Sequence, residues 1–271
     1  MSQSSFLKNP FFVTMPHSGE KIPDECEWLL GLPETTAMCD VDRYIDRIYQ
    51  PTLEEFLIVF HKTEWHRYAV DLNRIPEDVD SSSVVGSLNK PGTNNRGFHW
   101  VETTLGQSLM TQPMSFELHQ NLKQKIYDPF HLKIRNIYQD FFKMNHKNIY
   151  HLDAHSMPSV GTSMHRDPGQ IRADIVISDS LGKSCSKKFR DLVIAAYVTA
   201  GFKLGYNWPY VGGRLTEQYG QPEKGQHTIQ VELNRALYMD ENTKKLNEGF
   251  EEIRKKIAQA ISYIKSEIPN V

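Results

Sequence analysis

The chain has 271 residues, of which 39% are hydrophobic and 24% charged, with a formal net charge of -2 and a pI near 6.6. This balance is ordinary for a soluble globular protein and lacks the basic excess that attracts nucleic acid. No apolar run reaches the length of about 18 residues that a membrane span needs, and the first residues do not resemble a secretion signal, so no membrane partner is expected. The three cysteines lack the spacing of a disulfide framework and indicate reduced thiols in a cytoplasmic protein.

In the first half of the chain, short apolar runs alternate with one helical pattern. Residues 11–15 are apolar, end at Pro16 and predict a buried strand that delivers His17 into a loop. The other expected elements are a helix over 41–49 that Asp40 could cap and Pro51 could end, and strands over 57–60 and 68–70. Residues 75–113 are rich in Pro, Gly, Ser and Asn, and so long a loop in a compact domain is usually functional.

The second half continues the alternation of strands with helices. The expected elements are a helix over 115–145 interrupted near Pro129, strands over 149–152 and 173–177, a helix over 187–200 that ends at Gly201, a strand over 228–233 and a terminal helix over 241–268. Strands that alternate with helices imply a mainly parallel sheet with helices on both faces. We therefore predict a single α/β domain over residues 1–271.

Polar groups follow four of the predicted strands. They lie in the segments His17–Glu20, Asp71–Arg74, Asp153–Ser156 and Gln230–Asn234. Ligands bind beyond the carboxyl ends of the strands in such sheets, and two histidines with one carboxylate form a catalytic zinc site in which water takes the fourth position. A further carboxylate is then needed to move the proton of that water. The combination indicates a metal-dependent hydrolase in which His155 is a ligand.

Each of these residues also has an ordinary structural interpretation. His17 and His155 could be hydrogen-bonded core histidines, and Asp40 and Asp42 could cap the helix that follows them. Glu232 could be a solvated residue on the polar face of its strand. Structural roles alone explain less well why all of these side chains gather at predicted strand ends.

The order of the motifs resembles that of one enzyme family. The segments concerned are Pro16–Gly19, Asp40–Asp42, Arg67–Arg74, Asp153–Ser156, Gly212–Gly213 followed by Tyr219–Gly220, and Gln230–Met239. Together they look like the N-formylglutamate amidohydrolase family, and the match runs from about residue 11 to residue 240. The resemblance implies a three-layer α/β/α, phosphorylase/hydrolase-like fold with a mostly parallel mixed sheet.

A more distant similarity is to zinc carboxypeptidases, and it bears on the metal ligands. Both resemblances imply that His17 and His155 bind the metal, which would be Zn²⁺ or another divalent transition metal. The carboxypeptidase pattern places the third ligand at Glu20, three residues after His17, whereas the amidohydrolase pattern carries the Asp-x-Asp seen at Asp40 and Asp42. We favour Asp42 as the third ligand, with Glu20 as the alternative.

The resemblance also implies which residues perform the chemistry. Glu232 would be the general base that takes the proton of the attacking water and passes it to the leaving nitrogen. Arg67 would bind the substrate or stabilise the developing oxyanion. Asp153 would orient a metal ligand through a hydrogen bond.

The implied substrate is a small N-acyl amino acid, with N-formyl-L-glutamate as the best candidate and L-glutamate and formate as products. Arginine suits its carboxylates because the planar guanidinium binds them bidentately. Asn73 and Arg74 would bind the α-carboxylate. Arg214 would meet the second carboxylate, and Arg166 and Arg172 are further candidates on the loop after the second histidine.

Other classes of function remain open at this stage. The same residues could serve another metal-dependent deacylase or a carboxypeptidase, a non-catalytic protein that binds a metal or a small acid, or a partner-binding domain without a metal. Glu232 favours an enzyme, because a mere binding site has no need of a free acid beside a metal with three ligands. The sequence patterns do not predict an oligomeric state.

Overall fold

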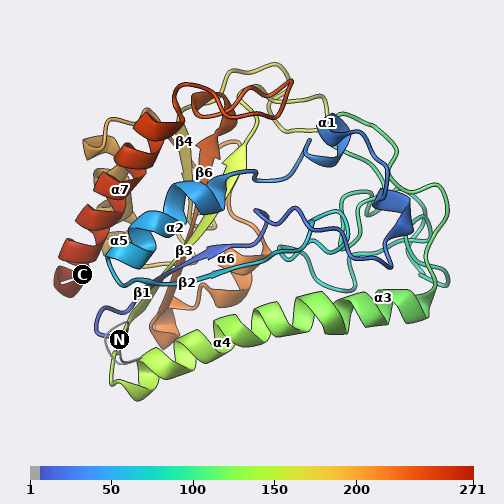
Figure 1. Cartoon of the computed structure of the whole chain (residues 1–271). Helices are drawn as coiled ribbons and strands as arrows, with labels where there is room; N and C mark the ends of the chain where they lie inside the picture. Colours follow the sequence, from blue (N-terminus) through green and yellow to red (C-terminus); the bar gives the residue numbers. More distant parts are fainter. Residues whose placement is uncertain (1–6) are drawn as a thin grey trace.

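A single sheet organises the protein, whose computed structural model describes residues 7–271. Its strands are β1 (Phe11–Met15), β2 (Val59–Lys62), β3 (Ile149–Met157), β4 (Ile175–Ser178), β5 (Leu204–Tyr206) and β6 (Gln226–Asn234). They lie in the order β2-β1-β3-β6-β4-β5 (Figure 1). All neighbouring strands are parallel except β4 and β6, which run antiparallel. The sheet is therefore mixed and mostly parallel, as predicted.

Helices cover both faces of this sheet. The α-helices are α1 (Glu34–Ala37), α2 (Ile45–Glu55), α3 (Phe116–Leu122), α4 (Asp128–Lys143), α5 (Lys187–Thr199), α6 (Arg214–Tyr219) and α7 (Phe250–Glu267). Figure 1 shows α2, α5 and α7 on one side of the sheet and α4 with α6 on the other. The fold is the three-layer α/β/α sandwich that the sequence predicted. No helix within residues 7–271 is both long enough and apolar enough to cross a membrane.

The central strands β3 and β6 separate an apolar face from a polar one. On β3, Leu152 and Ala154 belong to the apolar core beneath α2, α5 and α7, whereas Asp153 and His155 are equally buried on the opposite face. The pairing of β3 with β6 places His155 beside Glu232. Because side chains alternate along a strand, this register gathers the polar residues of two strands on one face.

Several elements differ from the sequence expectation. The predicted strands over 57–60 and 173–177 lie at Val59–Lys62 and Ile175–Ser178. Residues 68–70 do not form a strand, because a turn covers residues 67–69 and the Ala69 amide donates to the His66 carbonyl at 3.0 Å. Their side chains are apolar because they fill a second core cluster, not because they pair in a sheet. Helix α2 starts only after Tyr44, whose φ of 70° is incompatible with the helix, so Asp40 does not cap it. Helix α7 begins at Phe250, well after residue 241.

Other elements agree more closely or were not anticipated. The predicted helix over 115–145 runs through α3, a π-helical turn at Lys123–Tyr127 and α4, and Pro129 lies in the first turn of α4, directly after the π-helical turn. Gly201 follows α5 with a φ of 85°. Strand β5 and the helices α1 and α6 were not predicted, since each is short. Cys26, Cys39 and Cys185 are free and buried.

Candidate active site

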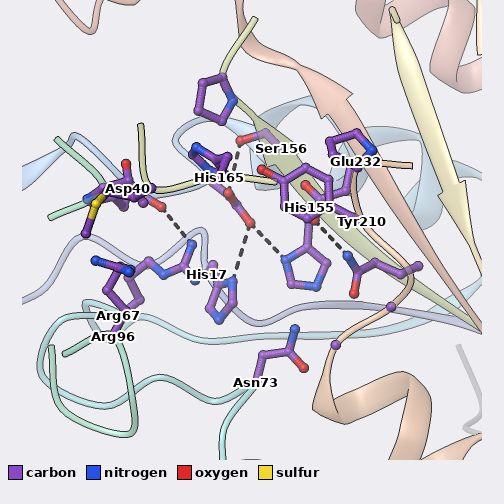
Figure 2. Close-up of a pocket in the computed structure, with 18 of the residues that line it drawn as sticks. His17, Asp40, Arg67, Asn73, Arg96, His155, Ser156, His165, Tyr210 and Glu232 are labelled. Carbon is purple, nitrogen blue, oxygen red and sulfur yellow. Dashed lines mark hydrogen bonds and ion pairs between the residues drawn. The ribbon is translucent and has the colours of Figure 1, made fainter. Parts of the chain in front are cut away.

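A cavity of about 360 Å³ opens at the carboxyl ends of β1, β3 and β6 (Figure 2). His17 follows β1, His155 lies near the end of β3 and Glu232 near the end of β6, so the parallel arrangement brings their side chains to one edge of the sheet. The long 75–113 segment contributes part of the wall through Trp100 and Thr104. The cavity therefore combines groups from segments that are far apart in the sequence.

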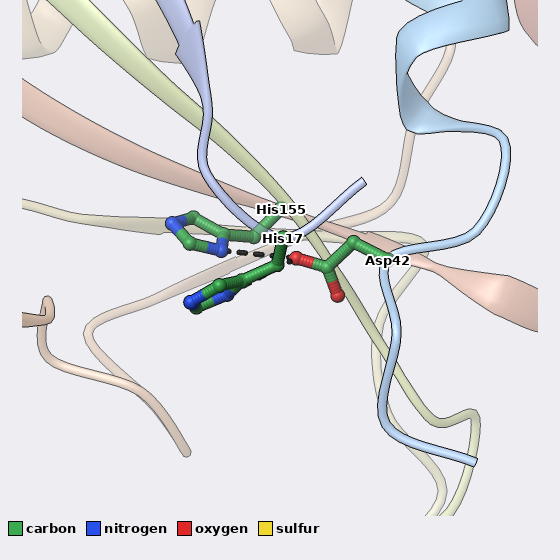
Figure 3. Close-up of side chains that lie close together, drawn as sticks. All are labelled: His17, Asp42 and His155. Atoms are coloured by element: carbon green, nitrogen blue, oxygen red, sulfur yellow. Dashed lines mark hydrogen bonds and ion pairs between the residues drawn. The ribbon is translucent and has the colours of Figure 1, made fainter. Parts of the chain in front are cut away.

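Two histidines and one aspartate converge inside this cavity (Figure 3). One ligand atom from each of His17, Asp42 and His155 lies within 4.8 Å of the others, and all three side chains are buried. Asp42 Oδ2 is 3.0 Å from His155 Nδ1 and 3.6 Å from His17 Nδ1. His17 Nδ1 is sealed from solvent but has no hydrogen-bond partner in the part of the chain that the structure describes. A buried donor set with an unpartnered nitrogen fits a metal ion better than it fits a core packing role.

A second carboxylate contacts the Nε2 atom of each histidine, on the side of the ring away from Asp42. Asp71 Oδ1 is 2.7 Å from His17 Nε2, and Asp153 Oδ2 is 2.7 Å from His155 Nε2. These contacts hold the Nε2 protons, so that Nδ1 of each ring is turned towards Asp42. Outer carboxylates of this kind orient histidine ligands in metal sites, and such a pair is present on both sides of the candidate centre.

The two carboxylate oxygens of Asp42 contact different groups. Oδ2 faces the histidines, while Oδ1 accepts hydrogen bonds from Arg235 Nη2 at 3.1 Å and from Ser156 Oγ at 3.1 Å. Burial alone would raise the pKa of Asp42, but the hydrogen bond from His155 and the nearby charges of His155 and His17 hold it well below its ordinary value. The carboxylate is therefore ionised and rotationally fixed, with one oxygen presented to the candidate metal position.

Glu232 lies beside His17, Asp42 and His155 but is not one of the three converging ligand residues. Gln230 Nε2 donates to Glu232 Oε1 at 2.7 Å, and no protein donor within the described residues contacts Oε2. Burial raises the pKa of Glu232, although the neighbouring charge of His155 opposes the shift. A buried carboxylate with one oxygen anchored and the other free has the character of a general base.

Arg67, the first arginine of the Arg67–Arg74 motif, already binds other groups of the protein. Arg67 donates to Asp71 Oδ2 at 3.0 Å and to the Asp40 carbonyl at 2.8 Å, and its guanidinium lies 4.7 Å from the centre of the Trp100 ring. It lines the cavity while held rigidly. Its charge is thus available to a substrate only from a fixed position.

Arg74 and Asn73 also line the cavity, but Arg74, unlike Arg67, forms no ion pair with a carboxylate among residues 7–271. Arg74 donates only to backbone carbonyls, those of Arg96 at 3.1 Å and of Asn73 at 3.1 Å, so its charge is not neutralised by a carboxylate within residues 7–271. The Asn73 Oδ1 atom accepts from the Leu215 amide at 2.8 Å. The amide group of Asn73 is therefore oriented, while the guanidinium of Arg74 remains free to bind an anion.

Gly213 packs directly against Asn73, and this contact is testable. A Cβ atom at position 213 would overlap the side-chain amide of Asn73. We expect Gly213→Ala to lower the free energy of unfolding by about 1–3 kcal/mol and to raise KM, because Asn73 must move. Denaturant unfolding and steady-state kinetics measure both effects. In an Asn73→Ala background the stability cost should shrink; an undiminished cost there would show that the overlap is not the cause.

Three predicted or alternative site residues lie elsewhere. Glu20 is partly exposed and pairs with Arg43 at 3.0 Å, away from the two histidine rings. Arg214, at the start of α6, is 41% exposed, does not line the cavity and faces Glu217 at 3.5 Å. Arg172 forms a buried pair with Asp167, whose carboxylate is 2.8 Å away. Arg166, in contrast, lines the cavity and has no carboxylate partner within residues 7–271.

Several side chains of the site carried no predicted role, among them Asp71, Arg235 and His165. Asp71 and Arg235 lie inside the motif segments, but sequence order alone does not tell which charged groups face inward. His165 lines the cavity and lies outside every motif segment. Only the number of histidines, 11 in the chain, could have drawn attention to it.

Comparison with known proteins agrees with this arrangement. The family model for N-formylglutamate amidohydrolase matches residues 9–239. The N-formylglutamate deformylase of Pseudomonas aeruginosa is 28% identical over 237 residues, which cover 86% of this chain and 83% of that protein. The enzyme of the same name from Pseudomonas putida is 26% identical over 237 residues, covering 86% and 82%.

A solved structure shares the fold over nearly the whole chain. The N-formylglutamate amidohydrolase from Ralstonia eutropha JMP134 superimposes with a TM-score of 0.86 at 22% identity, covering 97% of this chain and 95% of that one. The family model spans most of the sequence, including the segments that supply His17, Asp42, His155 and Glu232. The chain therefore belongs to the N-formylglutamate amidohydrolase family and is a hydrolase that acts on an amide bond.

Proposed function

We propose that this protein hydrolyses the amide bond of N-formyl-L-glutamate, releasing formate and L-glutamate, with the help of a divalent metal ion, most suitably Zn²⁺. The observation that carries the proposal is the buried group of His17, Asp42 and His155 beside the free carboxylate oxygen of Glu232. The names of the two Pseudomonas relatives support the choice of substrate.

The residues that would hold the metal are His17 and His155 through Nδ1 and Asp42 through Oδ2. Two imidazoles and one carboxylate are the donor set of catalytic zinc sites and leave a position for water. Burial lowers the pKa of His155, but the charge of Asp153 outweighs it and raises this pKa well above its ordinary value. A metal ion at Nδ1 would have to displace the proton there, because a histidine ligand binds through an unprotonated nitrogen. When bound, the metal would polarise the formyl carbonyl and lower the pKa of the attacking water.

Glu232 would move the proton. Its free Oε2 takes a proton from water as the water oxygen bonds to the formyl carbon, and the same oxygen then delivers this proton to the nitrogen as the carbon–nitrogen bond breaks. Gln230 keeps the other oxygen in place throughout. Arg67, held by Asp71, lies on the cavity wall where it would stabilise the negative charge that develops on the formyl oxygen.

The charges of the cavity favour a substrate with two carboxylates. Arg67, Arg96 and Arg235 each form an ion pair with an acid of the protein. Arg74 and Arg166 line the same cavity without a carboxylate partner among residues 7–271. We assign Arg74, with Asn73, to the α-carboxylate, and Arg166 in place of Arg214 to the second one. Because segments from residue 17 to residue 235 line one cavity, we further propose that the chain acts as a single catalytic domain.

The assignment of Arg74 can be tested with matched substrates. Arg74→Met should raise KM for N-formyl-L-glutamate about 30-fold, equivalent to about 2 kcal/mol for a lost charge-assisted hydrogen bond. Hydrolysis of an N-formyl amine that lacks the α-carboxylate should be unchanged, because that substrate never used the guanidinium. Steady-state kinetics on both compounds measures the difference, and an equal loss on both would assign Arg74 a structural role.

The proposed activity itself needs a substrate panel. Purified protein loaded with zinc should turn over N-formyl-L-glutamate faster than N-formyl amino acids with an uncharged side chain, and chelation should abolish the activity. A best substrate that contains a peptide bond would instead indicate a carboxypeptidase on the same scaffold.

A further inference from the structure

The loop between β3 and β4 carries one side chain that the proposed chemistry has not used. Within this loop, the Gly161 amide donates to the Gln170 carbonyl at 3.1 Å, and the Arg172 amide donates to the Ser159 carbonyl at 2.9 Å. Arg172 also forms the buried ion pair with Asp167 described above. These bonds tie the two ends of the loop together, so a residue at its tip is held in a defined position.

His165 lies at this tip, and its ring orientation is set by the chain itself. The backbone amide of Thr162 donates to His165 Nδ1 at 3.0 Å, and the Thr162 hydroxyl lies 2.8 Å from the same atom. A backbone N–H can only donate, so Nδ1 must be an acceptor and must carry no proton. The single proton of the neutral ring is therefore on Nε2, at the opposite side of the imidazole.

The surroundings of His165 favour the neutral ring. Burial, together with the positive charge of Arg172, lowers the pKa of His165 to about 4, and the opposing charges of Asp167 and Asp40 are the weaker influence. The Tyr210 ring packs edge-on at 6.2 Å. The imidazole is thus an uncharged donor of one hydrogen bond at the pH of ordinary assays.

The Nε2–H group is available to a ligand in the cavity. His165 lines the cavity and is only half-buried, and no protein acceptor within residues 7–271 contacts Nε2. Figure 2 shows its ring among the side chains around His155 and Ser156. A neutral donor that is already fixed in its tautomer stabilises an anion without giving up its proton and without reorganisation.

We propose that His165 is a catalytic residue that donates a hydrogen bond from Nε2 to an anionic oxygen of the bound substrate. This inference rests on the proposed function, because N-formyl-L-glutamate offers such oxygens in its carboxylates and, after attack by water, in the former formyl oxygen. It adds a donor that lies outside the motif segments and on a different loop from Arg67 and Arg74.

Two substitutions at position 165 distinguish the hydrogen bond donated by Nε2 from the packing of the imidazole ring. His165→Phe keeps a planar ring but removes the donor, and we expect kcat/KM for N-formyl-L-glutamate to fall about 10²-fold. His165→Gln retains an N–H donor and should recover part of this loss. A fall in kcat alone would assign the bond to the oxygen that becomes anionic in the reaction, and a rise in KM alone would assign it to a carboxylate. His146→Phe is the matched control and should change neither constant. His146 is half-buried outside the cavity, and its Nε2 donates to the Leu7 carbonyl at 2.8 Å.

Other results would overturn the inference. Unchanged kinetics in His165→Phe, or equal losses in both variants together with loss of bound metal measured by elemental analysis, would show that His165 does not donate to the substrate. If the wild-type protein hydrolysed no N-acyl amino acid, the proposed function would fail. The inference would then be decided by calorimetry with a phosphonate analogue of N-formyl-L-glutamate, which should bind wild type at least about tenfold more tightly than His165→Phe.

Discussion

Glu232→Gln is expected to reduce kcat by at least about 10³-fold, equivalent to about 4 kcal/mol of lost transition-state stabilisation. Glutamine preserves the size of the side chain but cannot accept a proton from water. Bound metal and the free energy of unfolding should change little, because Glu232 is not among the converging ligand atoms. Elemental analysis and steady-state kinetics on the same preparation measure both quantities.

A glutamate outside the cavity provides the control for this experiment. Glu20→Gln changes a partly exposed carboxylate that pairs with Arg43 and should leave kcat unaltered. Turnover near that of the wild type in Glu232→Gln would remove Glu232 as the general base. A variant that lost both turnover and metal would instead assign it to the ligand set.

Asp42→Ala is expected to abolish stable metal binding, and with it the activity. The aspartate offers the oxygen that lies 3.0 Å from His155 Nδ1, so its removal leaves the two histidines as the only converging donors among residues 7–271. Removal also leaves Arg235 buried without its ion-pair partner, which typically costs about 3–5 kcal/mol. Metal content after dialysis against buffered zinc measures the first effect, and denaturant unfolding of the metal-free protein measures the second.

The loss of stability could itself prevent metal binding, so a gentler variant is needed. Asp42→Asn keeps the shape and the hydrogen bond to Ser156 but weakens the ligand, and it should fold while binding zinc far less tightly. Glu20→Ala should retain the metal. If Glu20→Ala lost the metal and Asp42→Ala kept it, the third ligand would be Glu20, as the carboxypeptidase pattern implies.

The protein supports each candidate ligand through a separate set of bonds. Asp71 holds His17, Asp153 holds His155, and Arg235 together with Ser156 holds Asp42. All of these partners are buried, so their hydrogen bonds are made in a medium where they are strong and where an unpaired charge would be costly. Such a framework positions the donors before a metal arrives, which is the condition for a precise site.

Much of this site could be predicted from strand positions. The apolar run at 11–15 and the alternating pattern at 228–233 both became strands of the sheet, and the residues that follow or end them meet at one edge. Parallel strands make this outcome general, because their carboxyl ends share an edge whatever the loops do. The prediction failed for residues 68–70, where apolar side chains are buried by packing without strand pairing.

The sequence could not decide which loop residues reach the cavity, because their positions depend on the conformation of the loops. Arg214 and Arg166 are both arginines on loops or helix starts, yet only Arg166 lines the cavity. His165 carries a backbone hydrogen bond that sets its tautomer, and no periodicity or motif signals that bond. Loop conformation depends on contacts such as the Arg172–Asp167 pair, which no local pattern specifies.

The sequence by itself determined the α/β layering, the motif residues and the polar edge of the sheet, because hydrophobic periodicity and the parallel arrangement are enough to decide them. Only the tertiary structure decided which carboxylate approaches the histidines. Asp42 does so because the chain turns at Tyr44 before α2 begins, which frees the aspartate from capping and brings it within 3.0 Å of His155 Nδ1, while Glu20 turns away to pair with Arg43. That choice depends on the backbone turn at Tyr44 and on the buried Arg235, which donates to Asp42. Neither feature produces a periodic pattern in the sequence.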